Sequence, residues 1–284
     1  MKRSRIAFLF LAFTFCWIIT EAMAAQSGVS LYEVVWARYA VHIAAMLLIF
    51  GPRSGKTLVQ SPHMGLQIGR SLLMLGMPVF FIWAIHRTPM NNAIDILWLT
   101  PILIIILDRL FTREVPGWTV PTMTLVGYAG VVLIVRPSFT FDWSILFALG
   151  ASVCFALYII MTRTMRDEMF LPKMFHTALW VFLALTPFLP FFWQIPTLHG
   201  LIALIAVGLF GWVALFLLGR SIDEVPPAIF APVLYSIVLW PELFQGIARH
   251  VVPNHAAWLG SLLVIGSIGT TLLIGWRPPY QREI

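Results

Sequence analysis

Ten stretches of predominantly apolar residues, each long enough to cross a lipid bilayer, follow one another along this chain of 284 residues. A transmembrane helix needs about 20 such residues, because the hydrocarbon core is about 30 Å thick. Only 11% of the residues are charged, whereas a soluble domain carries roughly 25%, so soluble domains are excluded. The stretches lie near residues 5–24, 31–50, 66–85, 91–110, 117–135, 143–163, 173–193, 198–219, 225–246 and 256–276.

Lys and Arg residues are distributed unevenly between the loops that join these stretches. Fourteen of the 18 fall on the side of the N-terminus, three fall on the opposite side, and Arg38 lies within a span. Because basic loops stay in the cytoplasm, both termini are expected to be cytoplasmic, in a bacterial inner (plasma) membrane. The basic residues are scattered singly, so the net charge of +6 does not indicate nucleic-acid binding. The 14 are Lys2, Arg3, Arg5, Arg53, Lys56, Arg70, Arg109, Arg113, Arg163, Arg166, Lys173, Arg220, Arg277 and Arg282, and the three are Arg87, Arg136 and Arg249.

The two halves of the chain share a sequence pattern. The run from Gly127 and Gly130 to Arg136-Pro137 has a counterpart that begins at Gly266 and Gly269 and ends at Arg277-Pro278. Small residues at this spacing favour close helix packing. Five spans per half is an odd number, so the second half would enter the membrane from the opposite side. The pattern therefore predicts an all-α integral membrane protein, with ten transmembrane helices in two inverted five-helix repeats, 1–137 and 138–284, around a central cavity.

Three segments carry a family resemblance. The stretch from Trp83 through Thr88-Pro89-Met90 to Leu99-Thr100-Pro101, the stretch Val34 to Tyr39, and the stretch Gly127 to Pro137 resemble helix signatures of the drug/metabolite transporter superfamily, in its ten-helix, two-repeat branch. Within that superfamily the aromatic interior looks most like bacterial aromatic amino-acid exporters. The second half departs from the pattern, because Tyr235-Ser236 stands near the position of Trp98 to Pro101 and its prolines fall at Pro232 and Pro241. Similar shape is expected of the two halves, but not similar chemistry.

Aromatic residues deep in the spans are candidates for substrate binding, since stacked rings and a cation above a ring both stabilise a bound planar group. A proline within a span kinks its helix and can widen a cavity. Most aromatics in such a chain face lipid or pack between helices, and a proline can simply bend a helix. The expected substrate contacts are Trp17, Tyr39, Trp98, Pro101, Tyr158 and Tyr235.

Charged residues within spans are the sharpest signals, because a charge at the bilayer centre is costly and normally faces the protein interior. Arg38 is predicted to pair with Glu21 or Asp95, either as an outer gate or as a contact for a zwitterion. The alternatives are a purely structural ion pair and side chains that extend to the membrane interface. His42 lies on the same helix face as Arg38. It could relay protons, because imidazole titrates near neutral pH, or simply pack as a neutral side chain.

These features predict an inner-membrane transporter that exports aromatic or large neutral amino acids, or similar amphipathic metabolites, by alternating access. A multidrug or cationic-compound exporter is the alternative on the same scaffold. A membrane-embedded enzyme has no supporting motif. No cofactor, metal or nucleic acid is expected. The expected partners are a small-molecule substrate and the lipid bilayer, and a homo-oligomer is left open.

Overall fold

The computed structural model describes residues 3–111, 117–138, 142–249 and 254–275, and these residues form helices joined by short connections. The repeat counterpart at Arg277-Pro278 and the basic residues Lys2, Arg113 and Arg282 lie outside the described residues. The α-helices are α1 Arg3–Gln26, α2 Leu31–Val59, α3 Met64–Ile85, α4 Met90–Leu97, α5 Thr100–Phe111, α6 Thr119–Val135, α7 Ile145–Thr164, α8 Phe170–Leu185, α9 Leu189–Phe192, α10 Leu198–Glu224, α11 Pro227–Phe230, α12 Leu239–Arg249 and α13 His255–Thr270. Short helical segments of other pitch are η1 Thr186–Phe188, η2 Ala231–Val238 and η3 Thr271–Gly275.

Within the described residues, eight helices are long and apolar enough to span a membrane, so the predicted count of ten is not confirmed. Helix α6 is apolar but has only 17 residues. The stretch predicted as one span over 91–110 is divided into α4 and α5 at Trp98-Leu99. Pro101 explains the division, since proline has no N–H to donate to the preceding turn and its ring clashes with a continuing helix.

Proline also divides the corresponding stretch near the C-terminus. Pro227 begins the short helix α11, Pro232 lies at the start of η2, and Pro241 lies in the first turn of α12. The eight residues of η2 are all buried, so this irregular backbone is shielded from lipid by protein. Unsatisfied backbone groups are tolerated at membrane depth only in such a place.

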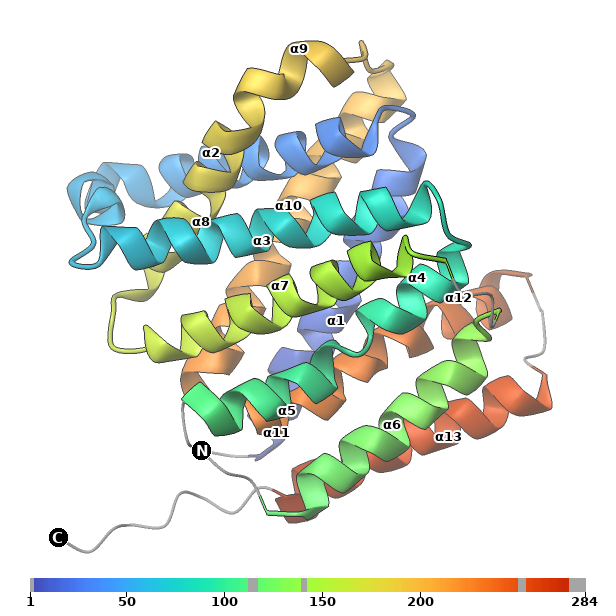
Figure 1. The fold of residues 1–284 in the computed structure, drawn as a ribbon. Coiled ribbons are helices and arrows are strands. Elements are labelled where there is room, and N and C mark those ends of the chain that lie inside the picture. The colour runs from blue at the N-terminus through green and yellow to red at the C-terminus, as the bar shows by residue number, and fades with distance from the viewer. Residues whose placement is uncertain (1–2, 112–116, 139–141, 250–253, 276–284) are drawn as a thin grey trace, which may run out of the picture.

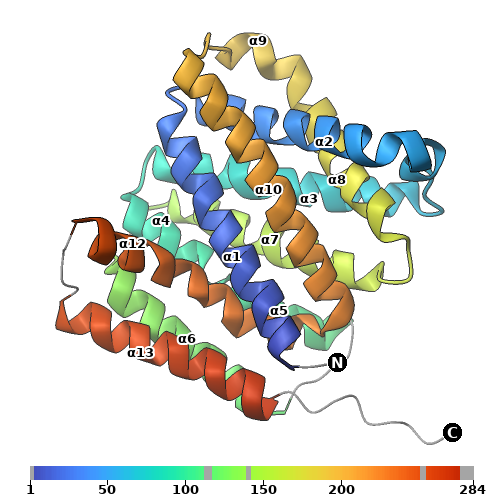
Figure 2. The same ribbon diagram turned by 180° about the vertical axis from the view of Figure 1, so that it is seen from behind.

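Three pairs of helices form the most extensive contacts: α1 with α10, α3 with α7, and α6 with α13. Figures 1 and 2 show the members of each pair side by side, with α8 crossing between α2 and α3. We call the end of the bundle where α1 begins and α2 ends the near end. The far end is where α1 ends and α2 begins.

Glycines set the closeness of α6 and α13. A Cβ on Gly130 would lie 2.6 Å from the carbonyl oxygen of Gly260, and a Cβ on Gly260 would lie 2.6 Å from that of Gly130. The predicted packing role is thus confirmed for Gly130 and also for Gly127, which faces Tyr235 and Ser267. It is wrong for Gly266 and Gly269, where a Cβ would meet no described atom within 4 Å. The close contact of α13 with α6 is made by Gly260 instead.

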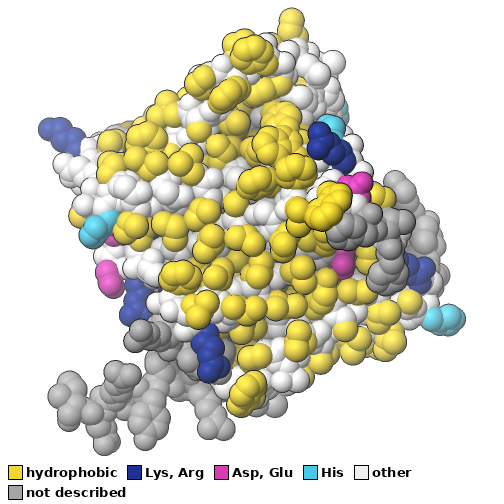
Figure 3. All heavy atoms as spheres, in the orientation of Figure 1, with side chains coloured by type: hydrophobic (Ala, Val, Ile, Leu, Met, Phe, Trp, Pro, Cys, Tyr) yellow, Lys and Arg dark blue, Asp and Glu magenta, His cyan; other side chains and the backbone are white. Residues whose placement is uncertain are grey.

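The surface matches an environment of lipid. Figure 3 shows hydrophobic side chains over the middle of one face, with charged side chains gathered toward the two ends of the helices. Trp118 and Trp143, near the starts of α6 and α7, are 84% and 75% exposed. Tryptophan favours the boundary between lipid and water, so these positions fit the edges of a membrane-embedded band.

Candidate functional site

The side chain of Arg38, on α2, lies between an aromatic ring and a bare stretch of backbone. Its guanidinium carbon lies 5.0 Å from the centroid of the Trp17 ring on α1 and 5.9 Å from that of the Tyr39 ring. On the other side, a Cβ on Gly211 of α10 would lie 2.6 Å from Arg38 Nε. A glycine at position 211 therefore makes the space that the arginine occupies.

Arg38 is only 9% exposed, yet its Nε and Nη2 have no hydrogen-bond partner among the described residues. His42, one turn further along α2, is fully buried, and neither of its ring nitrogens bonds to any described group. Buried polar groups are normally hydrogen-bonded, because an unpaired neutral group costs roughly 1–3 kcal/mol and an unpaired charged group costs more. Buried nitrogen atoms without a hydrogen-bond partner are typical of a site that binds a ligand.

Aromatic rings from both halves of the chain surround these two residues. The Trp17 ring lies 5.7 Å from that of Phe155 on α7, and the Tyr39 ring is stacked 6.4 Å from that of His42. Tyr158, one turn after Phe155, lies within electrostatic reach of Tyr39. The structure therefore brings together four predicted contacts, Trp17, Arg38, Tyr39 and Tyr158, with His42 beside them.

The predicted ion pairs of Arg38 are wrong for the part of the chain that is described. Neither Glu21 nor Asp95 comes within 4.0 Å of the Arg38 nitrogens. The Glu21 side chain is exposed near the end of α1 and interacts with Arg38 only at longer range. Asp95 instead accepts a hydrogen bond of 3.1 Å from the hydroxyl of Tyr128 on α6. The sequence predicted the depth of these charges in the membrane but not the direction in which each side chain points, and Asp95 faces α6 instead of α2.

The remaining predicted residues form a second group around the divided helix α4–α5. The Tyr235 ring lies 6.5 Å from the ring of Tyr128, which bonds to Asp95. Trp98 and Pro101 are buried at the break between α4 and α5. This group shares a hydrophobic core with Trp17 and Tyr158, but no ring or charge contact joins it to Arg38 within the described residues.

A polar cluster at the near end was not predicted from the sequence. Arg70 on α3 and Lys173 on α8 were counted among loop charges, yet they are only 1% and 2% exposed. Lys173 Nζ donates to Asp223 Oδ1 on α10 at 2.7 Å, and Arg70 donates to the carbonyl oxygen of Lys173. A usable signal existed, because Arg70 lies within the predicted span 66–85 and a charge there should face protein.

Glu168, in the connection between α7 and α8, closes the same cluster from outside. It receives hydrogen bonds of 2.7 Å from Gln67 Nε2 and 3.0 Å from Ser61, and its Oε1 lies 2.9 Å from His63 Nδ1. Partial burial alone would raise the pKa of Glu168, but these hydrogen bonds and the nearby His63 hold it below its usual 4.5. The carboxylate therefore ties the start of α3 to the end of α7 at neutral pH.

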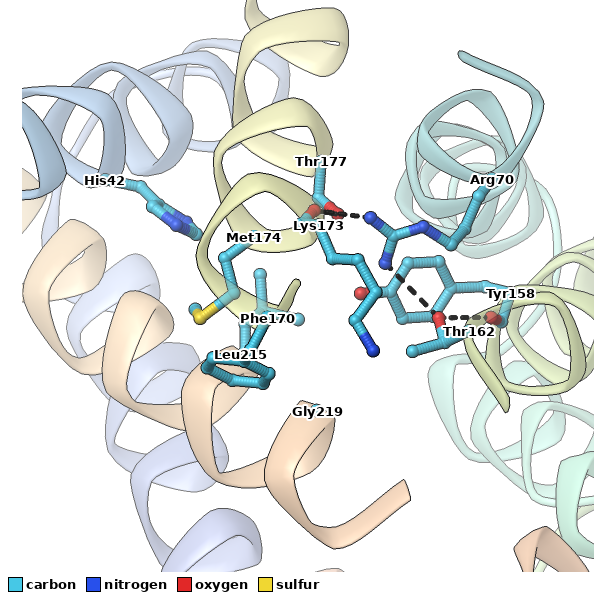
Figure 4. A pocket seen from close by; sticks show the side chains of 10 residues that line it. All are labelled: His42, Arg70, Tyr158, Thr162, Phe170, Lys173, Met174, Thr177, Leu215 and Gly219. Carbon is cyan, nitrogen blue, oxygen red and sulfur yellow. Dashed lines mark hydrogen bonds between the residues drawn. The ribbon is translucent and has the colours of Figure 1, made fainter. Parts of the chain in front are cut away.

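Two cavities differ sharply between the ends of the bundle. At the far end a cavity of about 420 Å³ is lined by Tyr32, Trp83, His86, Arg87 and Phe147, a size that suits a small metabolite. Toward the near end a cavity of about 10 Å³ is lined by ten residues that include His42, Arg70 and Lys173 (Figure 4). That volume holds about one water molecule. The far-end pocket is therefore much larger than the near-end cavity, and the two share no lining residue.

The geometry of buried, unsatisfied polar groups at the meeting of several apolar helices is typical of proteins that move solutes. Residues 4–136 match the EamA-like transporter family. This family match covers the first half of the chain, including Trp17, Arg38 and Asp95. Relatives that match 82–96% of this chain are also named as transporters. The comparisons therefore support a membrane transporter related to the EamA-like family.

The named relatives are bacterial transporters. An S-adenosylmethionine uptake transporter of Rickettsia bellii is 24% identical over 82% of this chain and 81% of its own length. A second one, of Rickettsia felis, is 25% identical over 82% and 80%. A riboflavin transporter of Vibrio cholerae is 22% identical over 96% and 92%. A solved crystal structure superposes with a TM-score of 0.85 at 17% identity, over 96% of this chain and 98% of that one, and it supports the fold alone.

These names bear on the predicted substrate. The narrower resemblance to aromatic amino-acid exporters is not shown, because the relatives are named for S-adenosylmethionine and riboflavin. The transport of a small metabolite is the part of the sequence-based prediction that the relatives support. An aromatic amino acid as the substrate has no support among them.

Proposed function

We propose that this protein carries a metabolite with a planar ring system and a charged group across a bacterial inner membrane. The observation that carries the proposal is the position of Arg38, buried against the Trp17 ring with unused N–H donors. A cation above a ring and a free charged donor can together hold a planar group and a negative group of one molecule. The expected contacts are Trp17, Arg38, Tyr39 and Tyr158, and Glu21 is suited to a positive group beside them.

The pattern of helix contacts supports two inverted repeats, 1–137 and 138–284, as the machine behind transport. If α1 corresponds to α7 and α3 to α10, then the pair α1–α10 corresponds to the pair α7–α3, and both are among the most extensive contacts. The pair α6–α13 corresponds to itself, as does the pair α2–α8. Such exchange symmetry is what two related halves produce, and in transporters substrate binds at their interface.

We infer alternating access from the difference in size between the two cavities. The excess of Lys and Arg assigns the near end to the cytoplasm, so the 420 Å³ cavity would face outward and the 10 Å³ cavity would be the closed inner half of the path. Movement of α8 and α10 away from α3 would open the inner half. The prolines at the helix breaks, Pro101 and Pro232, are suited to absorb that movement.

The substrate proposal changes from an aromatic amino acid to a larger ring-bearing metabolite. S-adenosylmethionine and riboflavin, for which the relatives are named, both contain a fused planar ring system. S-adenosylmethionine also carries a carboxylate that Arg38 could receive, and positive groups that Glu21 could receive. Uptake is the proposed direction, because four of the relatives are named for uptake.

Export of hydrophobic cations is the second candidate. It rests on Glu21, an exposed carboxylate near the far end of α1 without an ion pair in the described part of the chain. In this case the cation would bind at Glu21 and the aromatic rings, and Arg38 would not contact it.

Transport by purified protein in liposomes distinguishes these candidates. Radiolabelled S-adenosylmethionine, riboflavin, phenylalanine and tetraphenylphosphonium would each be tested in counterflow against liposomes without protein. Counterflow of S-adenosylmethionine supports the proposal, counterflow of riboflavin alone supports the planar ring but not the charged group, and counterflow of tetraphenylphosphonium alone supports the second candidate. Counterflow of phenylalanine alone would restore the original substrate prediction and contradict the revised one.

A further inference from the structure

We propose that Arg70 and Lys173 form a second anion-binding subsite, which receives the carboxylate of the substrate when the near end opens. This inference rests on the proposed transport function and names a substrate group and two residues that the first site does not include. The subsite lies in the small cavity shown in Figure 4, where Arg70 from α3 and Lys173 from α8 approach each other.

Arg70 is a buried cation whose hydrogen bonds all go to uncharged acceptors. Its Nη1 donates to Thr162 Oγ1 at 3.3 Å, and its Nη2 donates to Gln67 Oε1 at 2.9 Å and to the carbonyl oxygen of Lys173. Its Nε has no partner among the described residues. The guanidinium carbon lies 5.4 Å from the centroid of the Tyr158 ring. A buried charge is normally paired with an opposite charge, because removing it from water costs several kcal/mol.

Lys173 adds a second cation to the same cavity. Its Nζ donates to Asp223 Oδ1 at 2.7 Å, so this carboxylate is directly bonded to one of the two cations. Glu168 also acts on both charges from a distance, but its two oxygens are occupied by Ser61, Gln67 and His63. Two buried cations therefore line the cavity, and only Lys173 is bonded to a carboxylate, so a second carboxylate would complete the charge pairing.

The present volume of about 10 Å³ is too small for such a group. Asp223 lies on α10, while Arg70 lies on α3 and Lys173 on α8, so parting these helices would separate the aspartate from the cations. A substrate carboxylate could then replace Asp223, and its binding would stabilise the open near end. Asp223 would thus bind Lys173 in the closed state, and the substrate carboxylate would take its place in the open state.

Aromatic rings lie beside both arginines. Arg38 lies over Trp17 and Tyr39, Tyr39 lies within reach of Tyr158, and Arg70 lies over Tyr158. Both arginines also retain unused N–H groups within the described structure. A carboxylate could therefore pass from Arg38 at the far half to Arg70 at the near half while the ring of the substrate stays against aromatic side chains.

The test compares S-adenosylmethionine with its decarboxylated analogue in counterflow into liposomes. We expect the wild-type protein to prefer the carboxylate-bearing compound by about tenfold, as charged hydrogen bonds allow. Arg70→Gln should reduce this preference to about twofold or less, and Lys173→Gln should reduce it in the same direction. Arg70→Lys should keep a preference for the acid, because it keeps the charge. Arg53→Gln, which removes an exposed cation from the near end, is the matched control and should keep the wild-type ratio.

An unchanged ratio in Arg70→Gln would overturn the subsite, as would a wild-type ratio near one. If Arg70→Gln does not fold, the ratio in Lys173→Gln decides in the same way. Failure of the wild-type protein to carry either compound would contradict the proposed substrate class itself. The two failures are distinguishable, because the first is a missing or unchanged preference between compounds that are transported, whereas the second is the absence of transport of both compounds.

Discussion

The guanidinium of Arg38 and the ring of Trp17 lie 5.0 Å apart, between α2 and α1. The stacking is worth about 2 kcal/mol or more when both groups are desolvated, so it fixes the arginine even though its Nε and Nη2 bond to no described group. An arginine held by a ring and not by a carboxylate keeps its charge available. This is the property that a site for a negative group requires.

Gly211→Ala should displace Arg38 and weaken transport. The new Cβ would lie 2.6 Å from Arg38 Nε and 3.1 Å from its Cγ, so the side chain has to leave its place above Trp17. We expect counterflow of the transported compound to fall by about tenfold while the protein remains folded, at a stability cost of about 1–3 kcal/mol. Gly269→Ala is the control, because its Cβ would meet no described atom within 4 Å. Equal transport by the two variants would argue against the position of Arg38 as a functional one.

Trp17→Ala should raise the KM for a ring-bearing substrate by roughly two- to twelvefold, since a ring contact is worth about 0.5–1.5 kcal/mol beyond burial. Trp118→Ala, which removes an 84% exposed tryptophan at the start of α6, should leave the KM unchanged. Initial uptake rates at several substrate concentrations measure both. A KM for Trp17→Ala equal to that of the wild type would show that the ring packs helices without touching substrate.

Glu168 should make stability sensitive to acid. Hydrogen bonds hold its folded pKa below the usual 4.5, so the stabilisation is present above about pH 4.5 and is lost as the pH falls through the folded pKa. The melting temperature in detergent, followed from pH 7 down to pH 3.5, should therefore fall less in Glu168→Gln than in the wild type. Asp167→Asn is the control, since that side chain is 96% exposed. Parallel curves for wild type and Glu168→Gln would contradict the role of the cluster in holding the near end closed.

Gly130→Ala should lower the melting temperature, because the added Cβ would lie 2.6 Å from the Gly260 carbonyl oxygen and 2.9 Å from Val264 Cγ2. Overpacking of this kind costs about 1–3 kcal/mol. Gly266→Ala should melt within a degree or two of the wild type, because no described atom lies within 4 Å of its Cβ. Similar melting of the two variants would mean that α6 and α13 can separate freely.

The sequence predicted the helical membrane class and the deep location of Arg38 because both follow from hydropathy and the cost of buried charge. It could not predict which helix face meets which neighbour, because the rotation of a helix about its axis depends on helices far apart in the chain. Asp95 shows this, because it pairs with Tyr128 of α6 and not with Arg38. Gly211 shows it too, because its role exists only where α10 meets α2.

The near-end cluster was missed for a different reason. Arg70 and Lys173 lie within two turns of predicted span ends, where a long basic side chain commonly extends to the interface. Burial of both depends on Asp223 and on the closed arrangement of α3, α8 and α10. The sequence contains these residues but not the conformation that encloses them.

The substrate affinity of the Arg38→Gln variant decides whether Arg38 binds the charged group of the substrate. Neutralising this residue removes its stacking on Trp17 but also removes a buried charge with unpaired N–H groups. These two effects oppose each other, so the melting temperature should stay within a few degrees of the wild type. The equilibrium Kd of purified protein for the compound that it transports, measured by isothermal titration calorimetry, should nevertheless rise by about tenfold or more, as loss of a charged hydrogen bond predicts. A folded Arg38→Gln protein that binds this compound with the wild-type Kd would contradict the account.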